Sequence, residues 1–369
     1  MTEVNSVIRA CEILKAFQGE GELLRVRDIA ERTGIHKATV SRLLGTLVAA
    51  GFMERASQKR YSSSITVRHK RRAKIAYASQ AEDSPFAHEV SASIRRAAAM
   101  MDVELVFVDN RFSARTAVRN ANRLVREGVD IVIEFQTFES VAPLISSIFQ
   151  QAKIPMIAIG IPHPGATYFG ANNYEAGLIA GRALGRWAAQ NWDGKVDELI
   201  LIGLEAAGNL PRLRLTGALE GIREILPKFP EAGVVRLEGN DSFRRSLSVT
   251  RAHLRARRSV RALVTGINDA CSLGALSAFE EAGIAESCVV VGQGAIREAR
   301  DEMRKARTRM IGSVAFFPEQ YGEESIQVAL DILANRPVPP AVFTRHRLIT
   351  PQNVERYYGN DPITSERSG

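Results

Sequence analysis

The chain has 369 residues, of which 45% are hydrophobic and 24% charged, and this composition predicts a globular protein of two or three domains. Its net charge of +8 is unevenly placed, because residues 1–72 hold 14 Lys and Arg against 7 Asp and Glu, whereas residues 73–369 hold 35 against 34. This distribution excludes a chain that is basic throughout and predicts one small domain that contacts a polyanion.

The same sequence gives no sign of export or membrane insertion. No stretch approaches the roughly 18 consecutive apolar residues of a membrane span, and charged residues interrupt the N-terminal segment where a secretion signal needs an apolar run. The three cysteines are odd in number and lack CxxC spacing. We therefore expect a reduced, cytoplasmic protein.

The first 60 residues predict three short helices followed by a hairpin. The first helix is predicted to bury four apolar residues at helical spacing: Val7, Cys11, Leu14 and Phe17. A second helix over residues 26–32 ends before Gly34, where glycine accepts the left-handed backbone of a tight turn. A third helix follows to about residue 48, and residues 51–55 and 59–62 predict the two strands of the hairpin.

The third helix has one apolar face and one polar face, and the hairpin is basic. The segments Ser6–Ala10, Asp28–Gly34, Thr39–Leu44 and Gly51–Glu54 resemble the winged helix-turn-helix domain of the IclR family. A generic three-helix bundle would leave the hairpin and the local charge excess unexplained. The resemblance implies DNA contacts to phosphates and to base edges in the major groove. The residues expected to make them are His36, Lys37, Thr39, Ser41, Arg42, Lys59 and Arg60.

Residues 64–72 are polar and basic and predict a linker, either solvated or lying along phosphate. From residue 73 onward, short apolar runs alternate with longer amphipathic segments, which is typical of parallel sheets covered by helices on both faces. The predicted strands are residues 75–78, 103–108, 131–135, 156–159, 199–202, 234–237, 262–265, 289–291 and 311–315. Two α/β lobes with a cleft between them suit this number of strands.

This second region resembles the type I periplasmic-binding-protein fold, which LacI-type regulators use as a sugar-binding effector domain. The segments that carry the resemblance are Ser84–Phe86, Ala171–Gly177, Gly266–Asp269, Leu273–Ala275, Val290–Gln293 and Leu348–Val354. It implies two doubly wound parallel sheets with ligand residues at the C-terminal ends of strands and in the following loops. The expected ligand residues are Ser84, Phe86, Gln136, Arg214, Phe243, Asn268, Gln293 and Phe316.

Several of these residues also have a purely structural alternative. Phe86 suits a core position, Arg214 a surface ion pair, and Asn268 a turn or a helix cap. The chain also departs from the sugar-binding pattern, since Gly160 and Ile161 stand where many members have an Asp-Arg pair, and Gly294 stands where an aspartate is usual. The ligand is therefore expected to be a sugar or polyol, or a sugar acid or phosphate held near Arg214.

Catalytic signatures are lacking in the sequence. The segment Gly292-Gln293-Gly294 lacks the third glycine of a dinucleotide turn, and no P-loop, nucleophile elbow or HExxH occurs. The six histidines are scattered without metal-ligand spacing. We expect no enzyme, no metal and no cofactor.

Together these features predict a winged helix-turn-helix domain at 1–63, a linker at 64–72, a ligand-sensing domain at 73–358 and a disordered tail at 359–369. The function expected is a ligand-responsive transcription regulator, with repression relieved by a sugar-like effector as the preferred mode. A homodimer on paired half-sites is expected, and the sequence leaves a tetramer open. The alternative is a sugar-binding protein of a transport system with no role on DNA.

Overall fold

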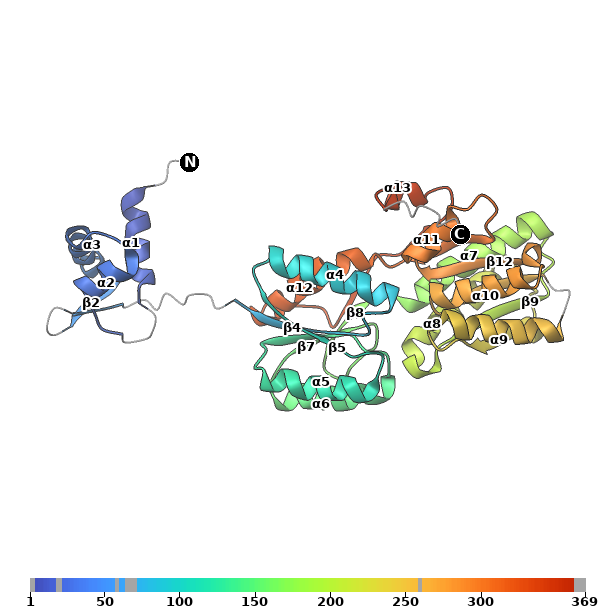
Figure 1. Ribbon diagram of the computed structural model, residues 1–369, viewed down its shortest axis with the longest axis horizontal. Coiled ribbons are helices and arrows are strands. Elements are labelled where there is room, and N and C mark those ends of the chain that lie inside the picture. Colours follow the sequence, from blue (N-terminus) through green and yellow to red (C-terminus); the bar gives the residue numbers. More distant parts are fainter. Residues whose placement is uncertain (1–3, 18–21, 57–59, 64–71, 258–260, 362–369) are drawn as a thin grey trace, which may run out of the picture. The chain divides into compact units, whose positions relative to one another are not determined.

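The computed structural model describes residues 4–17, 22–56, 60–63, 72–257 and 261–361. The chain forms two compact units, residues 1–72 and residues 73–369. The larger unit consists of two α/β lobes, each with its own sheet (Figure 1). None of the helices in the described ranges is long and apolar enough to cross a membrane.

The small unit is a three-helix bundle with a small antiparallel sheet. Its elements are α1 (Asn5–Lys15), β1 (Leu24–Arg25), α2 (Val26–Thr33), α3 (Lys37–Ala49), β2 (Met53–Ala56) and β3 (Arg60–Ser63). Strand β3 lies between β1 and β2, so the predicted hairpin is confirmed and gains a short third strand. Gly34 has φ of 69°, the left-handed conformation expected of the turn before α3.

The predicted apolar face of α1 is wrong in part. The prediction holds at Phe17, which is buried, and at Leu14, which packs partly against the core, but Val7 and Cys11 are exposed, and Ile13 and Ala16 are buried in their place. Apolar residues occur on more than one side of this helix, so spacing alone did not select the face that packs. The consequence is an exposed apolar strip of Val4, Val7 and Ile8.

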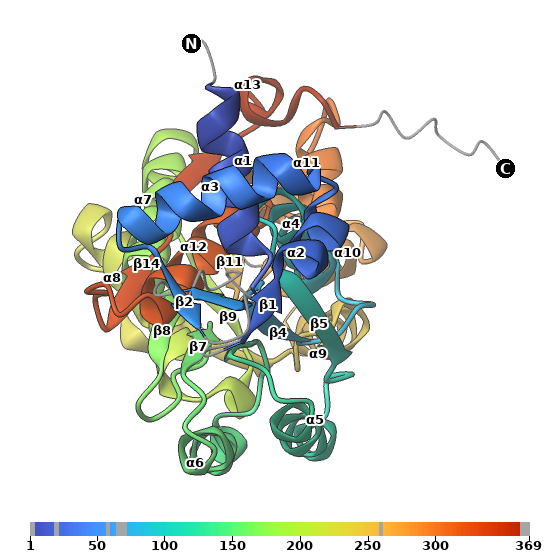
Figure 2. The same ribbon diagram turned by 90° about the vertical axis from the view of Figure 1, so that its left-hand side faces the viewer.

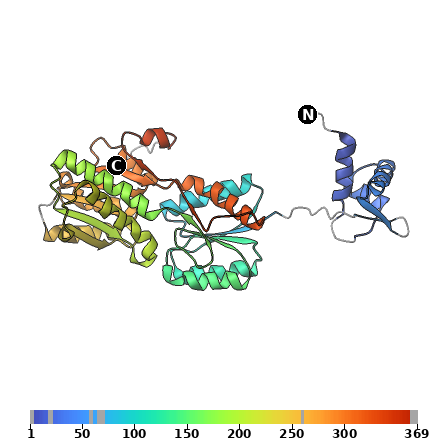
Figure 3. The same cartoon turned by 180° about the vertical axis from the view of Figure 1, so that it is seen from behind.

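The first lobe has a wholly parallel sheet in the order β14-β8-β7-β6-β4-β5. Its strands are β4 (Lys74–Ser79), β5 (Glu104–Asp109), β6 (Ile131–Glu134), β7 (Met156–Ile159), β8 (Thr167–Gly170) and β14 (Ala341–Phe343). Helices α4 (Pro85–Met100) and α12 (Tyr321–Leu333) cover one face, where they lie side by side (Figures 1 and 3). Helices α5 (Ala114–Arg126) and α6 (Ala142–Gln151) cover the other (Figure 2).

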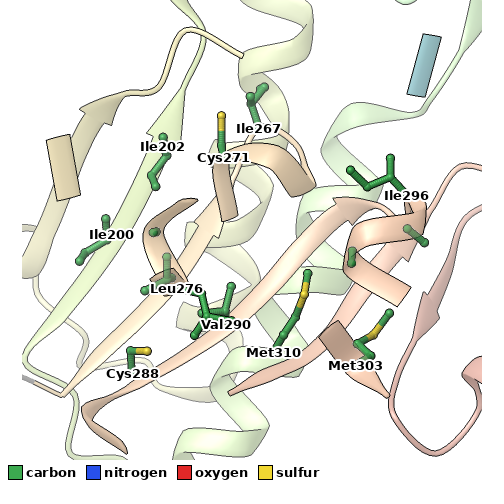
Figure 4. Close-up of a cluster of buried hydrophobic side chains, with 14 of the residues drawn as sticks. Ile200, Ile202, Ile267, Cys271, Leu276, Cys288, Val290, Ile296, Met303 and Met310 are labelled. Atoms are coloured by element: carbon green, nitrogen blue, oxygen red, sulfur yellow. The ribbon is translucent and has the colours of Figure 1, made fainter. Parts of the chain in front are cut away.

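The second lobe has the sheet order β10-β9-β11-β12-β13-β15, and only β15 is antiparallel. Its strands are β9 (Glu198–Gly203), β10 (Val234–Glu238), β11 (Ala262–Gly266), β12 (Cys288–Gly294), β13 (Met310–Ala315) and β15 (Arg347–Ile349). Its helices are α7 (Asn173–Trp192), α8 (Asn209–Ile225), α9 (Phe243–Ala256), α10 (Asp269–Glu281), α11 (Arg297–Met303) and α13 (Val354–Tyr358). Apolar side chains of β9, β11 and β12 pack with those of α10 and α11 in one of its cores (Figure 4).

The nine predicted strands are all present; most differ from the prediction by one or two residues, and β12 is four residues longer than the predicted 289–291. The chain passes between the lobes at residues 170–173, 316–320 and 344–346, so the first lobe is completed by α12 and β14 from late in the sequence. The predicted disordered tail is wrong for Asp361, because its carboxylate makes ion pairs with Arg300 at 2.8 Å and Arg304 at 3.0 Å. Residues 362–369 lie outside the described residues.

Helices α7 and α8 pack with their backbones in direct contact. A Cβ atom at Gly181 would overlap the carbonyl oxygen of Ala218, and one at Gly177 would overlap the carbonyl oxygen of Arg214. From the other side, a Cβ at Gly221 would lie 2.6 Å from the carbonyl oxygen of Leu178. Only glycine allows this approach, so these positions fix where α8 lies on α7.

We expect Gly181→Ala to lower the free energy of unfolding by roughly 1–3 kcal/mol, because the added methyl must push the two backbones apart. The exposed Ala189 of the same helix provides a control, and Ala189→Ser should change stability by less than about 0.5 kcal/mol. Urea unfolding of the full chain measures both. Equal stability of Gly181→Ala and the parent would contradict the close packing.

Candidate functional site

The third helix of the small unit presents a polar surface at its N-terminal end. His36 caps α3, and its Nδ1 accepts a hydrogen bond from the Ala38 amide at 3.4 Å. Lys37, Ser41 and Arg42 are exposed, as a DNA-contacting role requires. The prediction that Thr39 is exposed is not fully met, because it is half-buried beside the apolar face of the helix.

The hairpin residues predicted to contact DNA are less well placed to support that role. Arg60 begins β3 and is half-buried, and Lys59 lies outside the described residues. The structure is therefore compatible with contacts from α3, and the individual DNA contacts remain predictions.

In the large unit, Phe86 lies where the two lobes meet. Its ring packs edge to face against two rings of the first lobe, with centroid distances of 6.4 Å to Phe135 and 5.8 Å to Tyr321. It packs in the same way against Phe316 of the second lobe, at 6.2 Å. Phe86 also contacts the apolar cores of both lobes. The alternative of a plain core residue therefore describes it only in part, since it packs against the cores of both lobes.

Arg214 of α8 also packs on Phe316, with its guanidinium carbon 4.7 Å from the ring centroid. Its Nε donates to Asn173 Oδ1 at 2.6 Å, and its Nη1 donates to the Ile267 carbonyl at 2.8 Å. Burial lowers the pKa of Arg214 below its ordinary value, although nearby acidic and phenolic groups oppose this. The sequence alternative of a surface ion pair is thus wrong, because its bonded partners are neutral.

Asn268 follows β11 by two residues and has two roles at once. Its Oδ1 accepts from the Cys271 amide at 3.0 Å, which makes it the N-cap of α10, and its Nδ2 donates to Asp241 Oδ1. The capping alternative is therefore correct, and it leaves the amide nitrogen directed at a charged group in the cleft.

Asp241, which the sequence analysis missed, lies where loops of the two lobes meet. It follows β10 with φ of 54°, and its Oδ2 accepts from Gln80 Nε2 of the first lobe at 3.4 Å. Gln80 also donates to Thr137 Oγ1 at 2.6 Å, so this set joins loops of both lobes. Burial raises the pKa of Asp241 to about 6. Its only sequence signal is a polar Asn-Asp pair directly after a strand.

Other predicted ligand residues are not joined to this group by any recorded bond or ring contact. Gln136 is buried and bonds within its own lobe, to His163 at 3.4 Å and to the Phe138 amide at 2.5 Å. Ser84 precedes α4 without making a side-chain cap. Phe243 begins α9 and is 40% exposed. Gln293 is buried, and its Oε1 has no partner among the described residues.

The two lobes also touch at a second point. The carboxylate of Glu139 packs so closely on Gly208, at the start of α8, that a Cβ there would overlap it. A carboxylate near the N-terminal end of a helix is stabilised by the helix dipole. Within the described residues, no cluster of His, Cys, Asp or Glu could hold a metal ion.

The comparisons with known proteins agree with this geometry. The model of the periplasmic binding protein domain matches residues 75–337, which is most of the chain. The chain belongs to the periplasmic binding protein domain family. The model of the IclR helix-turn-helix domain matches residues 6–57, so both predicted resemblances are confirmed. Neither family is a family of enzymes.

Individual relatives cover separate parts of this periplasmic-binding-protein family member. The HTH-type transcriptional regulator TsaQ1/TsaQ2 of Comamonas testosteroni is 49% identical over 51 residues, which are 14% of this chain and 18% of that protein. A solute binding protein from Actinobacillus succinogenes with bound D-allose has a TM-score of 0.68 at 17% identity, over 78% of this chain and 100% of its own. The Caulobacter myo-inositol binding protein also scores 0.68, at 20% identity, over 77% and 95%.

In the first lobe, a carboxyl group is buried without an ion-pair partner among the described residues. Glu134 at the end of β6 accepts from Asn110 Nδ2 at 2.8 Å, and its Oε2 has no partner among the described residues. Burial raises the pKa of Glu134 to about 8. The group is therefore protonated in the folded protein at neutral pH.

This shift predicts a pH-dependent stability. Because the folded protein holds the Glu134 proton between about pH 5 and pH 8 and the unfolded chain does not, the free energy of unfolding should fall as the pH rises through this range, by on the order of a few kcal/mol. Glu134→Gln should remove most of the fall, and exposed Glu205→Gln should not. Denaturant unfolding at several pH values measures the free energy of unfolding of each variant. If this free energy depends on pH in the same way for the parent and Glu134→Gln, Glu134 is not a buried neutral acid.

Proposed function

We propose that the protein is a DNA-binding transcription regulator whose activity responds to a small molecule bound between the lobes of its periplasmic-binding-protein domain. The observation that carries the proposal is the presence, in one chain, of a matched helix-turn-helix with an exposed polar recognition surface and a matched two-lobed binding domain. A transport binding protein would not account for the first of these, nor for the +7 charge of residues 1–72.

The effector belongs to the sugars, polyols and related acids. Similar folds carry D-allose or myo-inositol, and the cleft combines aromatic walls with amide and guanidinium donors, a combination that suits polyhydroxylated ligands. Closure of the lobes on the ligand changes the affinity for DNA, with release of repression as the expected sign. A coupling free energy of about 1–3 kcal/mol is sufficient for regulation.

The protein acts in the cytoplasm as a homodimer. One short helix reads few base pairs, so two copies on paired half-sites are needed for specificity. The exposed strip of Val4, Val7 and Ile8 on α1 supports this assembly, because a second copy would remove it from water.

Arg42→Ala should weaken binding to promoter fragments by about 1–3 kcal/mol, since an arginine at this place on α3 makes charge-assisted bonds to DNA. Arg27→Ala is the matched control: Arg27 is an equally exposed arginine on α2 and pairs with Glu31 at 3.3 Å. Fluorescence anisotropy at one fixed salt concentration compares the affinities of the two variants for the same DNA fragment. Unchanged affinity of Arg42→Ala would count against α3 as the reading helix.

A thermal-shift screen of sugars, polyols and sugar acids on the full chain should find a compound that raises the Tm, because binding to the folded state alone stabilises it. The same compound should lower affinity for operator DNA. Asn268→Ala should reduce the ligand-induced shift, while its lower baseline Tm reports the lost helix cap. A variant that responds like the parent would exclude Asn268 from the site.

A further inference from the structure

Arg214 has donors left over after its structural bonds are counted. Guanidinium carries five N–H groups, and the recorded bonds use one on Nε and one on Nη1. The side chain is only partly buried, so a ligand can still reach it. The unused donors are both N–H groups of Nη2 and the remaining N–H of Nη1, and neighbouring N–H groups of a guanidinium can bind a planar anion in bidentate fashion.

No carboxylate of the described residues lies within ion-pair distance of Arg214, so its charge in the cleft has no contacting partner. The two acids whose charges act on Arg214 have other hydrogen-bond partners: Asp241 accepts from Asn268 and Gln80, and Asp269 accepts from Ser313 Oγ at 2.6 Å and the Ile296 amide at 2.8 Å. Placing a cation in a partly desolvated site without a contacting anion is unfavourable. The lowered pKa of Arg214 agrees with this.

The position of the guanidinium is also rigid. A Cβ atom at Gly177 would overlap the backbone oxygen of Arg214, so α7 fixes the backbone of this residue, and Asn173 and Phe316 fix its side chain. A preorganised cation loses little entropy when an anion binds.

The acidic acceptors that would select a neutral polyol are few. Residues 160, 161 and 294 carry no carboxylate, and a Cβ at Gly294 would lie 3.3 Å from Asp269 Oδ2 in a backbone conformation, φ 121°, that disfavours side chains. Hydroxyl groups of a neutral sugar must donate to acceptors, and Asp241, the carboxylate among these residues, already accepts from Gln80 and Asn268.

We propose that the effector carries an anionic group, a carboxylate or a phosphate, and that this group pairs with Arg214. The inference rests on the proposed function, since it names the chemical class of the molecule that the same cleft senses. The anion takes the unused N–H groups, and the rest of the ligand lies against the aromatic rings of Phe86 and Phe316.

The test compares matched triplets on the full-length protein: a neutral aldose, the corresponding sugar acid and the corresponding sugar phosphate, for the glucose, galactose and arabinose series. Calorimetry gives the Kd of each, and operator release is followed with the same compounds. At least one acid or phosphate should bind about tenfold or more tightly than its neutral counterpart. The acid and phosphate arms distinguish the two sources of charge.

Variants identify the residue responsible. Arg214→Gln should remove the preference for the anion, and Arg214→Lys should keep part of it, because lysine retains the charge but not the planar fork. Arg212→Gln, an exposed arginine on the same helix, should leave the preference unchanged. The Tm of each variant without ligand shows whether it folds. The preference for the anion is first measured on the unmodified protein, so that result does not depend on the folding of any variant.

A neutral sugar that binds as tightly as its acid and phosphate, or an anion preference that survives in Arg214→Gln, would overturn the inference. If such a neutral sugar also releases operator DNA, the proposed function stands and only the anionic character of the effector is wrong. If no member of any triplet binds, the inference is overturned. The proposed function fails as well only if the same preparation does not bind promoter DNA.

Discussion

The backbone contact between α7 and α8 is the constraint on which the sensing half of the protein depends. Glycines on both helices let the carbonyl of one chain segment reach the Cα of the other, and no side chain separates them. Asn173 begins α7 and Arg214 lies in the first turns of α8, so the same contact sets the distance between the amide and the guanidinium that it holds. Packing that seems purely structural thus determines the geometry of the cleft.

The cleft itself is assembled from segments far apart in the sequence. Phe86 from the first lobe meets Phe316, where the chain leaves the second lobe, and Gln80 of the first lobe bonds to Asp241 of the second. A ligand between these groups would interact with both lobes at once, so its binding energy can favour one lobe arrangement over another. This differential interaction is what a population shift requires.

The sequence predicted what depends on local pattern. Buried strands such as β6 and β11 read as short apolar runs, and Gly34 marked a turn because its backbone conformation requires glycine. The short β8, β14 and β15 were missed, since each is partly exposed and none forms a wholly buried apolar run like that of β6. Asp241 was missed for a different reason: its importance comes from Gln80, 161 residues away, and nothing in its own neighbourhood encodes that contact.

Arg214 illustrates how the balance of charges separates a structural residue from a recognising one. A buried arginine that served only the fold would be expected to meet a carboxylate, as Arg300 meets Asp361 and Glu89 in this same unit. Arg214 instead meets an amide oxygen, a carbonyl oxygen and an aromatic face, which orient the guanidinium without neutralising it. The nearby Asp241 is held by two amide donors. An oriented charge without a contacting counterion is the arrangement in which binding an anion gains the most.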